Sequence, residues 1–153
     1  MKRKIHLLAA VVATLCIAVF FISTIIVELF GSLDMIAAIK SLIVTPGLFI
    51  LIPAMVIVGG SGFSLGKSRK GRLVNVKKKR MPFIALNGLF ILTPCAIFLS
   101  IWATSGIFDT AFYIVQGIEL VAGAVNLVLM GLNMRDGLKM TGVGIPRFVK
   151  QPY

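Results

Sequence analysis

Ionisable side chains inside long apolar stretches carry most of the chemical information in this chain. The 153 residues include five acids and one histidine, and Glu28, Glu119 and His6 fall within apolar stretches. A charged side chain is costly in hydrocarbon, so its presence there indicates ligand binding, proton transfer or hydrogen bonding between helices. These three residues are therefore the first candidates for a functional site.

A polar stripe runs along the stretch 110–134. At about 100° per residue in a helix, six side chains fall within an arc of about 100°. They are Gln116, Glu119, Gly123, Asn126, Met130 and Asn133. Such a stripe has to face the interior of a helix bundle or a wet cavity. Hydrogen bonds between helices and a functional path are both consistent with it.

The two carboxyl groups invite different interpretations. Glu119 lies near the middle of its stretch, and we expect no Lys, Arg or His at its depth. Without a cation or water nearby, such a carboxyl is largely neutral. It then either carries protons or binds substrate, or it shares a hydrogen bond with Gln116 one turn away. Glu28 is expected near the outer interface, solvated or paired with Lys40.

His6 is the only histidine, so the chain cannot hold two haems through pairs of histidines or build a zinc site from histidine alone. A single haem b remains open, with His6 as one ligand of the iron and Met130 or Met134 as the second. Both methionines are expected in the same half of the bundle as His6. The alternatives are a histidine that contacts headgroups or a backbone carbonyl, and methionines that only pack.

Hydropathy predicts the elements that position these groups. Hydrophobic residues make up 58% of the chain and charged residues 14%, and the mean hydropathy is +1.01. Soluble domains carry about 25% charged residues, so an ordinary soluble globule is excluded. Four apolar stretches, near 5–30, 36–59, 82–104 and 110–134, each reach the roughly 20 residues that cross a bilayer as a helix. The sequence predicts an all-α integral membrane four-helix bundle, with residues 1–153 as one domain.

The cations are unevenly distributed along the chain. Of the 16 Lys and Arg, all except Lys40 lie before the first stretch, in the basic loop 60–81 or in the tail 135–153. By the positive-inside rule these segments and both termini are cytoplasmic. The net charge of +11 indicates anionic lipid headgroups at the basic loop as partners, and no nucleic acid.

Prolines interrupt the two middle stretches. Pro46, Pro53 and Pro94 each remove a helical hydrogen bond and tend to kink the helix, which can open space between helices. A short echo accompanies them, because the sequence GLFILIP at 47–53 returns as GLFILTP at 88–94. In antiparallel helices this echo indicates either an inverted repeat of the transporter type or a chance match.

Near its start the chain reads Lys4-Ile5-His6-Leu7-Leu8, which places a histidine just inside the first of four apolar stretches, with basic loops on one side. It resembles the small haem-linked membrane proteins related to the bacterial protoporphyrinogen oxidase and copper-resistance D families. The resemblance covers the first stretch and the overall layout, and it implies haem ligation by His6 in a bacterial inner membrane. A second matching histidine is absent, which leaves the other ligand of the iron open.

Three functions are consistent with these residues. A haem-binding or redox-linked membrane protein comes first. A proton-coupled small-solute transporter would use Glu119, and a structural or accessory subunit would use the same polar groups only for packing. Whether the chain is an enzyme stays open. A chain of this size needs self-association or a partner membrane subunit to enclose a sizeable aqueous path.

The topology gives the first testable prediction. In a chain without Cys16 and Cys95, a cysteine introduced at Lys70 should react with an impermeant thiol reagent only after cells are permeabilised, because the basic loop is cytoplasmic. A cysteine at Ser105, in an outer connection, should react in intact cells and serves as the control. Labelling of position 70 in intact cells contradicts the prediction.

Overall fold

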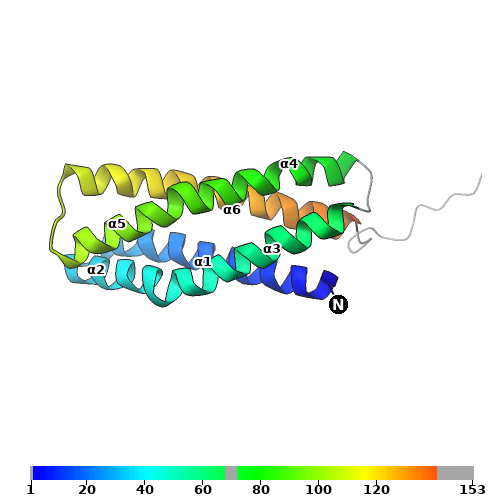
Figure 1. The fold of residues 1–153 in the computed structure, drawn as a ribbon. Helices are drawn as coiled ribbons and strands as arrows, with labels where there is room; N and C mark the ends of the chain where they lie inside the picture. The colour runs from blue at the N-terminus through cyan, green and yellow to red at the C-terminus, as the bar shows by residue number, and fades with distance from the viewer. Residues whose placement is uncertain (1, 68–71, 141–153) are drawn as a thin grey trace, which may run out of the picture.

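The computed structural model describes residues 2–67 and 72–140, and these residues form a bundle of helices (Figure 1). Four helical segments are long and apolar enough to cross a membrane, namely Lys4–Phe30, Leu33–Gly62, Val74–Thr104 and Thr110–Lys139. The prediction of an all-helical chain with four such segments is confirmed. In hydrocarbon each helix satisfies its own backbone hydrogen bonds, which is why apolar runs of this length adopt this structure.

The first and last segments are continuous helices, and the two middle ones are built from several pieces. The elements in chain order are α1 (Lys2–Phe30), α2 (Leu33–Leu42), η1 (Ile43–Leu48), α3 (Phe49–Lys67), α4 (Arg72–Asn87), η2 (Gly88–Leu92), α5 (Thr93–Thr104) and α6 (Thr110–Met140). The element η2 is π-helical, with a wider turn than an α-helix, whereas η1 is a kink at which the backbone of Thr45 is not helical. Each overlaps one copy of the echoed sequence at 47–53 and 88–94.

Short turns connect the helices at one end of the bundle, which we call the turn end. Ser32 caps α2 by accepting a hydrogen bond from the backbone N–H of Met35 at 3.3 Å. Asp109 in the same way accepts from the N–H of Phe112 at 2.9 Å at the start of α6. Gly106, at φ 70°, supplies the left-handed backbone conformation that the second turn requires.

The opposite end, which we call the terminal end, holds Lys2 and Met140 (Figure 1). Here the structure differs from the expected loop at 60–81 and tail at 135–153. Helix α3 continues to Lys67, α4 begins at Arg72, and α6 continues to Met140. Ser61 supports the glycine-rich part of α3, because its hydroxyl donates to the carbonyl of Ile57. Residues 68–71 and 141–153 of these two segments lie outside the described part of the chain.

Small and apolar residues fill the interior. Helix α1 packs along α3 through a face on which Ala13, Ile17 and Thr24 are buried. Towards the turn end a second cluster surrounds Leu99 and Phe112, which are both fully buried. Large apolar side chains elsewhere point outward, as expected for a surface that faces hydrocarbon.

Two asparagines join α4 to α6 in the interior. The side-chain amide of Asn87 donates to the carbonyl of Ala122 and to Oδ1 of Asn126, both at 2.9 Å. The amide of Asn126 donates in turn to the carbonyl of Ile84 at 3.4 Å. Because hydrocarbon offers no competing partners, these bonds fix the register of the two helices.

This pair generates a stability prediction. Asn87→Ala should lower the free energy of unfolding by about 1 kcal/mol, because it removes hydrogen bonds between helices inside the bundle. The measurement is reversible unfolding in mixed detergent micelles. Asn75→Ala is the matched control, since Asn75 is exposed on the same helix. Equal effects of the two substitutions would contradict the assignment of Asn87 as a helix-joining residue.

Candidate functional site

A buried ion pair lies in the half of the bundle nearer the turn end. Lys40 Nζ of α2 is 2.5 Å from Glu119 Oε2 of α6, and the two side chains are 0% and 12% exposed. The expectation that no cation lies at the depth of Glu119 is therefore wrong. Lys40 is seven residues and Glu119 nine residues from the turn-end start of its helix, so their depths nearly match.

The surrounding polar groups complete this site. Gln116 donates from Nε2 to the same Glu119 oxygen at 3.1 Å, so the expected hydrogen bond one turn away is confirmed. The expected pairing of Glu28 with Lys40 is not formed, because Lys40 contacts Glu119 instead. Glu28 still lies within electrostatic range of both groups. Its Oε1 is buried without a hydrogen-bond partner.

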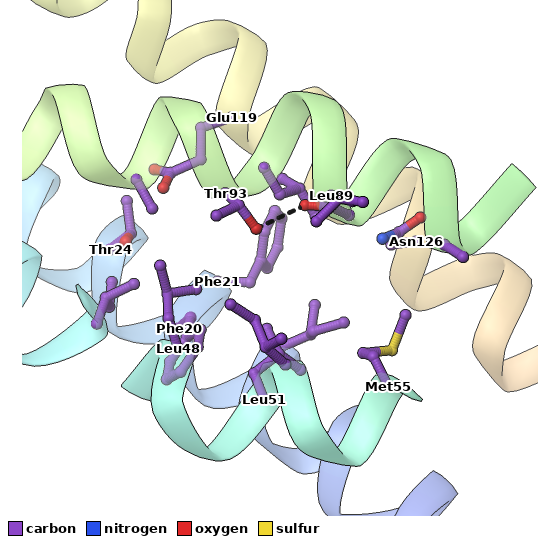
Figure 2. A pocket seen from close by; sticks show the side chains of 18 of the residues that line it. Phe20, Phe21, Thr24, Leu48, Leu51, Met55, Leu89, Thr93, Glu119 and Asn126 are labelled. Carbon is purple, nitrogen blue, oxygen red and sulfur yellow. Dashed lines mark hydrogen bonds between the residues drawn. The ribbon is translucent and has the colours of Figure 1, made fainter. Parts of the chain in front are cut away.

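A cavity of about 280 Å³ lies between α1 and α3 on one side and η2, α5 and α6 on the other. Figure 2 shows Thr24 and Glu119 towards one end of this cavity and Met55 and Asn126 towards the other. Apolar side chains make up most of the wall between them, including Phe20 and Leu51. The cavity is thus an apolar space with one ion-paired carboxylate in its wall.

The backbone explains why side chains do not fill this space. The kinked element η1 and the π-helical element η2 both contribute to the wall, so the backbone departs from regular α-helical geometry on both sides of the cavity. The wall also contains residues with little or no side chain, namely Gly59, Ala85, Gly88, Ala96 and Gly123. The hydroxyl of Thr93 donates to the carbonyl of Gly88 at 2.9 Å and so satisfies a backbone group beside the cavity.

The cavity opens towards the region that hydrocarbon would occupy. Val56 of α3 and Leu89 of η2 both line it, and they are 67% and 54% exposed on the outside of the bundle. A ligand can therefore enter between α3 and η2 without crossing the packed ends of the bundle.

The stripe on α6 faces inward, as its spacing predicts. Gln116, Asn126, Met130 and Asn133 are all buried. Their surroundings nevertheless differ, because Asn126 reaches the cavity whereas Met130 packs in an apolar cluster with Ala13. Asn133 Oδ1 is buried without a hydrogen-bond partner. The stripe therefore serves partly for packing and partly for the cavity.

The structure does not bring together the residues expected to ligate haem. His6 is 2.9 Å from the Ser61 hydroxyl and lies beside Gly62 and Met81. Met134 contacts Thr14, two helical turns from His6, or about 12 Å along α1. His6 and Met134 therefore do not fit as ligands of one iron, and no group of three or more metal-ligating side chains occurs among the described residues. Haem binding stays a prediction, which an absorption spectrum of the purified protein tests.

Asp136 is a structural residue that sequence reasoning missed. It is buried near the terminal end of α6 and accepts a hydrogen bond from Arg80 Nη1 of α4 at 2.9 Å, with Arg135 at 3.4 Å. The sequence did contain a signal for Asp136. It is the one acid in the segment 135–153, and it stands there among several cations. This ion pair holds the ends of α4 and α6 together.

Comparison with known proteins adds no relative. No protein-family model, no curated protein and no solved structure matches this chain. We therefore infer function from the ion pair and the cavity.

The ion pair gives a stability prediction. Glu119→Gln should lower the free energy of unfolding by roughly 3 kcal/mol, because it leaves the buried Lys40 ammonium without its counter-charge. Combining it with Lys40→Met should restore part of the loss, since no unpaired charge then remains. Unfolding in mixed micelles measures both variants.

Asp34→Asn is the matched control, because Asp34 is an exposed acid on α2. Its effect should stay within about 0.5 kcal/mol. Additive effects of Glu119→Gln and Lys40→Met would show that the two groups do not stabilise each other.

Proposed function

We propose that this chain is a multi-pass membrane protein that acts as a small-solute carrier and binds a largely apolar solute in the cavity between its helices. Glu119 contacts the polar group of the solute, and the apolar wall holds the remainder. The observation that carries this proposal is the cavity of about 280 Å³ with an ion-paired carboxylate in its wall.

The chemistry of the cavity supports a binding role. Ligand sites in proteins are typically lined by apolar side chains, with a few polar groups that orient the ligand. An empty apolar space also forfeits the dispersion contacts of the atoms that line it, so a ligand of matching shape regains them. Packing alone accounts for Asn87 and Asn126, but it does not explain a cavity bordered by the kink in η1 and by the π-helical element η2.

The opening between α3 and η2 supports entry from the bilayer. An apolar solute concentrates in hydrocarbon, and the exposed wall residues Val56 and Leu89 lie where it would arrive. The cavity would then exchange its ligand with the membrane, as a carrier of apolar molecules requires.

The orientation in the membrane belongs to the same proposal. We place the terminal end on the cytoplasmic side of a bacterial inner membrane, because the cations of the chain other than Lys40 lie in the segments at that end. The ion pair and the polar end of the cavity then lie in the outer half of the bilayer.

Filling the cavity tests the binding role. Gly88→Leu should reduce retention of n-decanol at least tenfold, because the new side chain occupies the space. A Cβ at position 88 meets its nearest neighbours, Asn126 and Met55, at 3.6 and 3.9 Å, so the backbone tolerates it. Native mass spectrometry of the full chain counts the decanol adducts.

Gly117→Leu provides the matched control. Position 117 is exposed on α6 with no atom within 4 Å of an added Cβ, so the same change of residue should leave retention unaltered. Circular dichroism checks that both variants stay helical. Equal retention by Gly88→Leu and the original chain would overturn the proposed function.

A further inference from the structure

The polar end of the cavity contains more acid than base. Two carboxyl groups, Glu28 and Glu119, lie in electrostatic range of a single ammonium group, Lys40. Lys40 is fully buried and its contact is with Glu119, so Glu28 has no counter-ion of its own among the described residues. If both carboxyl groups are ionised, the cluster carries one uncompensated negative charge.

Glu28 lies close to the wall of the cavity. It follows Thr24 by four residues on α1, so the two side chains lie on the same face of the helix one turn apart. Thr24 lines the cavity and is buried. The Oε1 atom of Glu28, buried and without a hydrogen-bond partner, is therefore one turn beyond the cavity's polar end.

Acids and cations are unevenly distributed between the two ends of the bundle. Four of the five acids, Glu28, Asp34, Asp109 and Glu119, lie in the half of the bundle nearer the turn end. Lys40 is the cation that accompanies them there, and the basic residues that flank the apolar stretches lie towards the other end. Such a field attracts cations to the polar end of the cavity and repels anions, and it acts strongly where low-dielectric walls surround the charges.

The remainder of the cavity favours the apolar part of a ligand. From Glu119 to Asn126 the cavity extends along α6 for about 10 Å. Phe20, Leu48 and Met55 contribute to its wall (Figure 2). A ligand that satisfies both parts has one positively charged group next to the carboxylates and an apolar body that extends towards Asn126.

We infer that the solute of this cavity is a cationic amphiphile, an organic cation with an apolar body, whose positive charge is balanced by Glu28 and Glu119. This inference rests on the proposed function, because it assigns a ligand class to the same cavity. Glu119 stays bonded to Lys40 when the site is empty, and Glu28 supplies the charge that the ligand neutralises.

Three probes of equal chain length test the inference on the full chain. Decyltrimethylammonium should be retained at least tenfold better than n-decanol, and decyl sulfate should be retained least, as counted by native mass spectrometry. Glu28→Gln should remove most of the preference for the cation over decanol, because the substitution removes the carboxylate charge. Asp34→Asn, which removes an exposed acid of the same half, should leave the preference intact.

The outcomes separate the two proposals. If Gly88→Leu reduces decanol retention but the cation is retained no better than decanol, the proposed ligand class is wrong. The proposed binding role of the cavity is then kept. An undiminished preference in Glu28→Gln also overturns the ligand class. If Gly88→Leu affects no probe, the cavity itself is not the binding site. The probe series on the unaltered chain decides the ligand class even if Glu28→Gln fails to fold.

Discussion

Lys40 and Glu119 place an ammonium and a carboxylate where hydrocarbon can solvate neither. Each group is costly alone and tolerable only with the other, so the pair fixes α2 against α6. With α6 held in this orientation, its polar stripe faces the interior and Asn126 meets Asn87 of α4. The position of the candidate site therefore depends on one contact between residues 79 positions apart in the chain.

The cavity arises from the backbone as much as from the side chains. In both middle segments the helix departs from regular α-helical geometry near a proline, as a kink at Thr45 in η1 and as the π-helical element η2, and residues of both elements line the cavity. Small residues such as Gly88 and Gly123 then leave the space open. The echoed sequences at 47–53 and 88–94 each overlap one of these two elements, and both elements contribute residues to the wall of the cavity.

The two ends of the bundle use charge differently. At the terminal end, where the described residues include more cations than acids, Arg80 and Asp136 join α4 to α6. Towards the turn end the acids outnumber Lys40, and one of them, Glu119, lies in the wall of the cavity. A field of this kind would orient the proposed amphipathic ligand within the bundle.

The sequence by itself determined the helices and the inward direction of the α6 stripe. Both are local properties, because in hydrocarbon each helix satisfies its own backbone and buries its most polar face. It also identified Glu119 and Gln116 as neighbours, since they lie one turn apart. Helical structure at 60–67 and 72–81 was not foreseen, because glycines and like charges resemble a loop in composition.

The tertiary structure alone decided which partner Lys40 takes and where the cavity opens. From the sequence we expected Lys40 only as a partner of Glu28, and the packing of α2 on its neighbours places it against Glu119 instead. The separation of His6 from Met134 was hidden for the same reason, since both belong to one half of the bundle but lie at different heights. Contacts between distant helices depend on their rotation and axial shift, and hydropathy constrains neither quantity closely.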